Sequence, residues 1–253
     1  MRVSGIPAGT RVSSKVAGQP LHFAVSATDS TAAEAFAALP IDADGSLGVV
    51  LFCSVGERQD SFVIRLETRS ANYPIDHLTV APRFATPPDS ATAERIRRES
   101  ERALAVAKNA HETPRLWSDP FVLPRQSRIT SGFGHAREYN GTLTSRHMGT
   151  DFAGASGAPV RAVNRGVVRI VDAFFYGGNV VYVDHGAGLT SAYLHLSQQA
   201  VTAGDTVGRG QVIGRVGATG RVTGPHLHLI VRYGDVTVDP MSLFAIAGEP
   251  SGR

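Results

Sequence analysis

The stretch His226-Leu-His-Leu-Ile-Val-Arg-Tyr233 lies near the C-terminal end of the 253-residue chain. Its β-branched and aromatic residues predict a β-strand. Side chains two residues apart on a strand point to the same face. We therefore expect His226 and His228 to project side by side into one space, a geometry that suits one metal ligand beside one acid/base group.

A second pattern, His147-Met-Gly-Thr-Asp151, lies 75 residues before this strand. Together the two patterns offer three imidazoles and a carboxylate, the ligand chemistry of a zinc site that keeps one position open for water. An isolated His-x-x-x-Asp is weak evidence, because such a pair could be a surface hydrogen bond. The His-x-His on a strand is the stronger signal.

Short apolar runs separated by glycines fill the chain from Pro114 onward. They predict a twisted antiparallel sheet with a groove on one face, and no long amphipathic helix interrupts them. Glycine pairs at the turns supply the positive φ that tight hairpins need. The expected strands are Val160–Val163, Gly166–Val171, Asn179–Asp184, Leu189–His195, Val212–Val216 and His226–Tyr233.

The first 86 residues contain strand-like runs that predict a small immunoglobulin-like β-sandwich. These runs are Leu21–Val25, Gly48–Cys53, Ser61–Leu66 and Asp76–Val80. A helix from Ser90 to Ala110, with Asp89 as its N-cap, is expected to follow. The chain is thus predicted to be mainly β, with a sandwich domain (1–86), a linker helix (87–113) and a C-terminal antiparallel sheet domain (114–253).

Charge and composition exclude several classes of protein. Residues 114–253 carry about +4 and the rest about −1, which suits an anionic or carboxylate-bearing substrate. No basic run with interleaved aromatic residues favours nucleic acid, and no apolar stretch is long enough to span a membrane. The single cysteine, Cys53, lies in an apolar run and is expected to be a small core residue.

The C-terminal half resembles the lysostaphin/LytM-type zinc peptidases, which cut peptidoglycan. The resemblance spans about residues 125–240 and rests on three ordered motifs: His147-x-x-x-Asp151, Tyr193-Leu-His195-Leu and Gly224-Pro-His-Leu-His228. Further matches are Ser131-Gly-Phe-Gly134, Gly157-Ala-Pro-Val160, Gly210-Gln-Val-Ile-Gly214 and Gly217-Ala-Thr-Gly220. The resemblance implies the family's peptidase fold, with an open zinc cleft.

The resemblance also implies a division of labour among the site residues. His147, Asp151 and His228 would bind Zn²⁺, and His195 and His226 would be the unligated catalytic pair that handles protons. Arg137, Tyr139 and Asn140 would line the cleft and bind substrate, although a purely loop-stabilising role is equally open. The remaining histidines of this half are His185, expected to be structural, and His135, expected near the rim of the groove.

The expected function is zinc-dependent hydrolysis of peptide bonds in peptidoglycan stems or cross-links by a metal-activated water. The alternative is a LytM-like non-catalytic domain that binds or activates another cell-wall hydrolase, but this chain keeps all five histidine and aspartate positions. A biotinyl or lipoyl carrier domain would need a lysine at a hairpin tip, and residues 114–253 contain none. The resemblance implies a periplasmic or extracellular location. The N-terminus lacks the apolar core of a signal peptide, so the residues alone allow either a cytosolic protein or a mature exported form. The resemblance implies the mature form.

Overall fold

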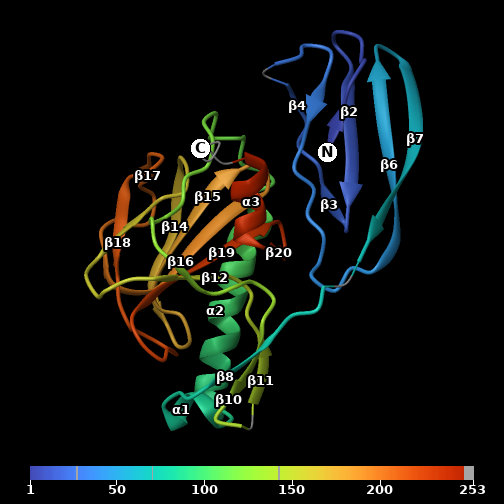
Figure 1. Ribbon diagram of the computed structural model, residues 1–253. Helices are drawn as coiled ribbons and strands as arrows, with labels where there is room; N and C mark the ends of the chain where they lie inside the picture. The colour runs from blue at the N-terminus through green and yellow to red at the C-terminus, as the bar shows by residue number, and fades with distance from the viewer. Residues whose placement is uncertain (27, 70, 142, 248–253) are drawn as a thin grey trace. The chain divides into compact units, whose positions relative to one another are not determined.

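The structure is a computed structural model that describes residues 1–26, 28–69, 71–141 and 143–247. The chain divides into two compact units, Met1–Asn72 and Tyr73–Arg253. The boundary therefore lies before the segment around residue 76 that the sequence assigns to the N-terminal domain. Figure 1 shows the helices and strands of each unit.

The N-terminal unit consists of two small antiparallel sheets, in the orders β1-β5-β4 and β3-β2-β6-β7. Residues of both sheets share one apolar cluster, in which Val12, Ala33 and Leu51 are buried and Cys53 is packed against them. The strands are β1 (Arg2–Val3), β2 (Arg11–Val16), β3 (Gln19–Pro20), β4 (Ala24–Val25), β5 (Ala33–Glu34), β6 (Gly45–Val55) and β7 (Arg58–Thr68). The all-β character is confirmed, and the immunoglobulin-like form stays a prediction.

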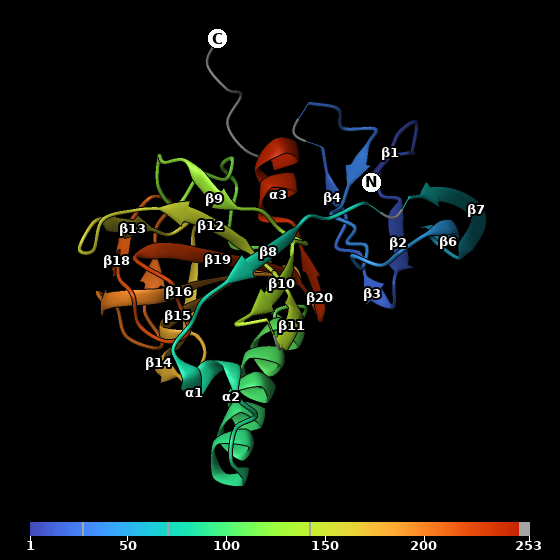
Figure 2. The same ribbon diagram turned by 60° about the horizontal axis from the view of Figure 1, so that its bottom comes forward.

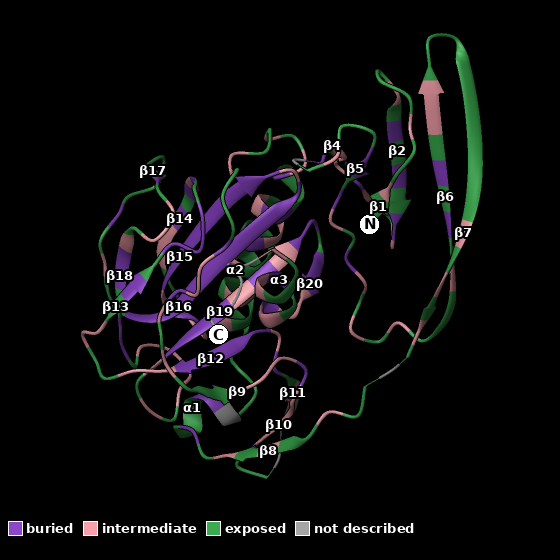
Figure 3. Ribbon diagram, turned by 45° about the horizontal axis from the view of Figure 1, so that its top comes forward, coloured by how far each residue is buried: buried purple, intermediate pink, exposed green. Residues whose placement is uncertain are grey.

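The C-terminal unit is built on one large antiparallel sheet, whose main path runs β17-β14-β15-β16-β19-β12-β9. Further pairing joins β18 to β13 and β16, and β20 to β19. Figure 3 shows that β15 and β16 are buried along most of their length. The strands are β9 (Ile129–Ser131), β12 (Thr150–Ala153), β13 (Pro159–Arg161), β14 (Gly166–Phe174), β15 (Gly178–Gly186), β16 (Leu189–Gln199), β17 (Thr206–Val207), β18 (Val212–Val216), β19 (His226–Tyr233) and β20 (Val236–Val238).

The predicted helix is present as α2 (Ser90–Asn109), and the Asp89 side chain caps it by accepting a hydrogen bond from the backbone N–H of Thr92. Its buried residue Ala103, with the half-buried Val106, packs on a cluster contributed by β14, β15 and β16. Two shorter helices are α1 (Pro82–Ala85) and α3 (Pro240–Ala247). Within the described residues, no helix is long and apolar enough to cross a membrane.

A second, three-stranded sheet of this unit has the order β11-β10-β8. Strand β8 (Ile75–Leu78) runs parallel to β10 (Ala136–Tyr139), which forms an antiparallel hairpin with β11 (Leu143–Arg146). Figure 2 shows β8 alongside β10. The segment that follows the N-terminal unit is thereby fixed onto the hairpin that precedes His147.

Candidate metal centre

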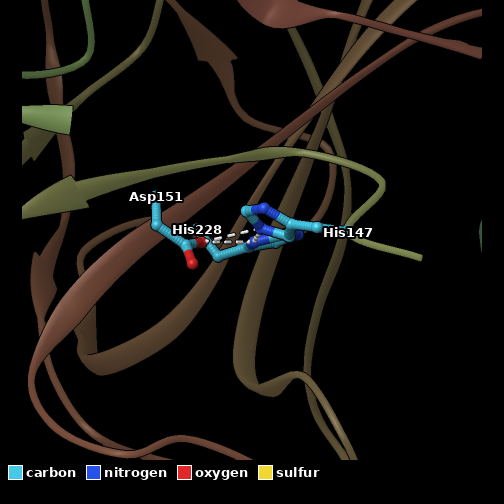
Figure 4. A group of neighbouring side chains, drawn as sticks. All are labelled: His147, Asp151 and His228. Atoms are coloured by element: carbon cyan, nitrogen blue, oxygen red, sulfur yellow. Dashed lines mark hydrogen bonds and ion pairs between the residues drawn. The ribbon is translucent and has the colours of Figure 1, made fainter. Parts of the chain in front are cut away.

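The site begins with the register between two neighbouring strands. Asp151 on β12 lies directly opposite His228 on β19, and side chains of directly opposite residues share one face of a sheet. His147 enters from the loop between β11 and β12. Figure 4 shows the three side chains converging on one point.

The three donor atoms form a tight triangle. His147 Nε2 lies 3.0 Å from Asp151 Oδ1 and 2.9 Å from His228 Nδ1, and His228 Nδ1 lies 2.7 Å from Asp151 Oδ1. All three residues are buried, and they form a group that could hold a metal ion. Two imidazole nitrogens and one carboxylate oxygen are the donor set of a zinc site with an open position, so the residues present fit the expected ion.

Neighbouring backbone groups hold the His147 ring in place. Its Nδ1 donates to the carbonyl of Gly132 at 2.7 Å, which leaves Nε2 unprotonated and directed at the triangle. Such outer hydrogen bonds fix the tautomer of a ligating histidine. Gly149 is needed beside the site, because a Cβ there would lie 2.4 Å from the Leu229 carbonyl and 2.7 Å from the His228 ring.

Burial and charge set the protonation of the triangle. Burial raises the pKa of Asp151, but its interactions with the rings of His147 and His228 outweigh burial and hold that pKa well below the usual value. Burial lowers the pKa of His228 to about 4, against the opposing influence of Asp151. A charged carboxylate and a neutral imidazole are the forms that bind a divalent metal.

Two further histidines stand beside the triangle: His226, as its spacing from His228 on one strand predicts, and His195, as the family resemblance implies. His226 Nε2 lies 3.6 Å from Asp151 Oδ1, and the rings of His195 and His226 are 5.0 Å apart. Each Nδ1 donates to a backbone carbonyl, that of Gly224 for His226 and that of Thr219 for His195, both at 2.9 Å. Each therefore presents an unprotonated Nε2, which can accept a proton.

The backbone of His195 explains how its ring reaches the site. Leu194 pairs with His228 on β19, whereas Leu196 pairs with Val216 on β18, so β16 changes partner at His195. Regular alternation would place His195 on the face opposite His228. A φ of +64° at His195 breaks the alternation, and its ring centroid lies 5.8 Å from that of His228. Such strained backbone at a non-glycine residue is typical of functional sites.

Arg137 contacts the triangle directly. Its Nη2 donates to Asp151 Oδ2 at 2.6 Å, which leaves Oδ1 to the histidines, and lies 3.3 Å from Ser131 Oγ. Its Nε is buried and has no hydrogen-bond partner among the described residues. Ser131 in turn donates to Asp76 of β8 at 2.8 Å. The sequence did not single out Ser131 or Asp76, because nothing local reveals the pairing of β8 with β10.

The two other predicted cleft residues have different surroundings. Tyr139 is only 3% exposed and packs with Val80 and Phe84. The Asn140 amide is engaged with the backbone of Val80, accepting from its N–H at 2.9 Å and donating to its carbonyl at 3.0 Å. These contacts tie Asn140 to the segment that follows β8, and Asn140 lines neither of the two cavities beside the triangle.

The remaining histidines lie outside the triangle. His185 is fully buried, and its Nδ1 donates to the Arg165 carbonyl at 2.7 Å while Nε2 lies 2.8 Å from Ser191 Oγ. His135 Nδ1 lies 3.1 Å from Asp76 Oδ1. The first contact set is that of a structural residue, and the second belongs to the anchoring of β8.

Two cavities adjoin the triangle. The larger, of about 700 Å³, is lined by Asp151 and His226 together with residues of β8 and β9. The smaller, of about 170 Å³, is lined by His147, His195 and His228. Arg137, Tyr139 and Arg221 line both. The open nitrogens and the metal-binding atoms thus border space that a substrate can enter.

Part of this chain is similar in sequence to known proteins. Residues 145–240 match the model of peptidase family M23. Peptidoglycan DD-endopeptidase ShyB of Vibrio cholerae is 44% identical over 117 residues, covering 45% of this chain and 27% of that protein. Peptidoglycan DD-endopeptidase ShyA of the same organism is 48% identical over 108 residues, covering 42% of this chain and 25% of that protein.

A solved structure from Pseudomonas aeruginosa, provisionally assigned as a peptidase M23, is similar over nearly the whole chain. It covers 95% of each chain with a TM-score of 0.70 and 26% sequence identity. The curated relatives are much longer proteins, because the matched part of this chain spans only about a quarter of their length. The match to the family model, residues 145–240, lies in the half that carries the triangle.

Proposed function

We propose that this chain, which belongs to peptidase family M23 through residues 145–240, is a zinc-dependent endopeptidase. It would act on peptide bonds of peptidoglycan stems or cross-links. The observation that carries the proposal is the triangle of His147, Asp151 and His228 beside two histidines that each present an unprotonated Nε2. The printed activities of the Vibrio cholerae relatives supply the substrate class.

Zinc is the cofactor that this donor set favours. His147 Nε2, Asp151 Oδ1 and His228 Nδ1 would hold the ion, and Arg137 would keep the second oxygen of Asp151 turned away from it. When bound, the ion would polarise a substrate carbonyl and lower the pKa of a bound water to about 7. The protein's part is to fix three donors and leave one position open.

His195 and His226 would move the protons. Each holds its Nδ1 proton on a backbone carbonyl, so the Nε2 atom of either ring can accept a proton from the attacking water and return it to the leaving amine. Burial, helped by the charges of His228 and His226, lowers the pKa of His195 well below its usual value. A neutral base at neutral pH is the form that this step needs.

The lining residues would bind the peptide. Arg137 has a spare buried Nε donor, and Tyr139 borders both cavities. Asn140 would act indirectly, by holding the backbone at Val80. A peptidoglycan substrate would place the protein in the periplasm or outside the cell, and the N-terminal unit would be an immunoglobulin-like accessory domain.

Digestion of purified peptidoglycan tests the proposal. Wild-type protein and the His226→Ala variant are incubated with peptidoglycan, and the fragments are analysed by mass spectrometry. We expect new amine and carboxyl ends from the wild type alone, and their masses identify the bond. Identical fragment sets from the two proteins would refute the endopeptidase assignment.

A further inference from the structure

Arg221 is held rigidly between two tyrosine rings. Its guanidinium carbon lies 4.3 Å from the ring centre of Tyr139 and 4.2 Å from that of Tyr176. The Arg221 backbone N–H donates to the Tyr176 carbonyl at 2.9 Å, so both partners are fixed locally. Tyr139 is buried, and Tyr176 packs on Phe84 and Phe175. Stacking on aromatic faces immobilises the guanidinium before any ligand arrives.

The position of Arg221 places this cation at the candidate site. It lines the larger cavity together with Asp151 and His226, and the smaller cavity together with His147 and His195. A peptide that reaches the metal-binding triangle through either cavity therefore shares that cavity with Arg221.

The charges around the site leave Arg221 without a counter-ion. Arg137 is paired with Asp151, and the carboxylate of Asp76 is engaged by Ser131 and His135. Among the described residues, no hydrogen bond or ion pair of the Arg221 side chain is present, and its contacts are the two rings. Ring stacking uses the faces of a guanidinium and leaves its N–H edge free for a carboxylate, which it can bind with two parallel hydrogen bonds.

We infer that Arg221, held between Tyr139 and Tyr176, binds a free carboxylate of the substrate peptide close to the bond that is cleaved. This inference rests on the proposed endopeptidase function and adds a specificity to it. Peptides that carry a carboxylate beside the scissile amide are preferred over the same peptides in which that group is amidated. Arg221 selects the substrate and takes no part in proton transfer.

A matched pair of peptides tests the inference. Both join D-alanine to the amine of a diaminodicarboxylic acid, and the carboxyl group beside that amine is free in one and a carboxamide in the other. We expect the zinc-loaded wild type to cleave the acid with a kcat/KM about 10- to 100-fold higher than the amide, mainly through KM, as for a hydrogen-bonded charged group.

Variants separate Arg221 from the general positive charge of the cleft. Arg221→Gln is expected to reduce the preference to less than about 3-fold, through slower cleavage of the acid, and Arg221→Lys to keep only part of the preference. Arg128→Gln is the control, because Arg128 lines only the larger cavity and is exposed. Loss of the preference in Arg128→Gln, or its survival in Arg221→Gln, would overturn the inference.

Direct binding distinguishes failure of this inference from failure of the proposed function. Calorimetry on the full chain measures Kd for both peptides with wild type and Arg221→Gln. If neither peptide is cleaved, the proposed function fails, and tighter binding of the acid by the wild type alone still supports the carboxylate site. Equal Kd values for acid and amide with the wild type refute it, whatever the variants do.

Discussion

The hairpin β15–β16 carries a buried histidine near its turn and another near its open end. The two histidines differ in their hydrogen bonds and backbone geometry. His185 lies beside the turn and is 0% exposed, and His195 lies near the far end of β16 and is 7% exposed. Burial is the largest influence on both, lowering the pKa of His185 to about 4 and that of His195 well below its usual value. Neither burial nor pKa distinguishes the two residues.

Hydrogen bonding and backbone geometry do distinguish them. Both nitrogens of His185 have partners, and the Ser191 hydroxyl beside it lies 3.0 Å from the Tyr193 hydroxyl. His195 uses only Nδ1, its Nε2 has no partner among the described residues, and its φ is +64°. A buried histidine with an open nitrogen on strained backbone is therefore the better candidate for catalysis.

The largest effect is expected at the open end of the hairpin. His195→Ala removes a group that we propose transfers protons, so kcat/KM should fall about 10³-fold, while zinc content and the thermal midpoint stay close to those of the wild type. Peptidoglycan turnover and metal analysis of the same preparation measure both. A loss of less than about 10-fold would remove the distinction between the two histidines.

The reverse pattern is expected at the turn. His185→Ala deletes two hydrogen bonds and leaves a cavity, and should lower the free energy of unfolding by about 3 kcal/mol. Turnover per folded molecule should stay within about 3-fold of the wild type. Urea denaturation gives the first quantity, and activity normalised to the folded fraction gives the second. A stable but inactive His185→Ala would contradict the structural role.

The pH dependence of stability sharpens the same contrast. Because the pKa of His185 falls from 6.5 to about 4 on folding, the unfolded chain binds a proton between these values that the folded chain does not. Stability is therefore full above pH 6.5 and is lost as the pH falls toward 4. Between pH 7 and pH 5, protonation of this histidine in the unfolded chain should lower the free energy of unfolding by about 2 kcal/mol. The loss measured by denaturation should be smaller by that amount in His185→Gln, and equal losses would contradict the linkage.

The two carboxylate oxygens of Asp151 also differ in their partners. Its Oδ2 is held by Arg137, and its Oδ1 faces the two histidines. Arg137→Gln should loosen the carboxylate and weaken zinc binding about 10-fold. Competition with a chromophoric chelator measures the change, and Arg128→Gln serves as the control. Unchanged zinc affinity in Arg137→Gln would mean that Arg137 does not position Asp151.

Much of this arrangement is visible in the sequence, because it depends on local patterns. Strands β18 and β19 have the predicted limits, and α2 begins at its predicted cap. The placement of His226 and His228 on the same face of β19 follows from strand periodicity alone. Strand β2 was missed because Arg11–Val16 reads as polar, although every second residue is buried.

What could not be predicted depends on contacts between distant segments. The pairing of β8 with β10 joins residues about 60 positions apart, and it places Asp76 beside Ser131. The positive φ of His195 arises where β16 passes from β19 to β18. The hydrogen bond from Arg137 to Asp151 and the stacking of Arg221 on Tyr139 also join distant segments, so the sequence alone does not reveal them.

We expect the two histidines of β19, two residues apart on one strand, to have different roles. Zinc content and turnover are measured together for His228→Ala and His226→Ala, purified under the same gentle conditions. We predict that His228→Ala loses both zinc and activity, and that His226→Ala keeps about one equivalent of zinc and loses activity. Loss of zinc from His226→Ala, or retention of zinc and turnover by His228→Ala, would contradict the account.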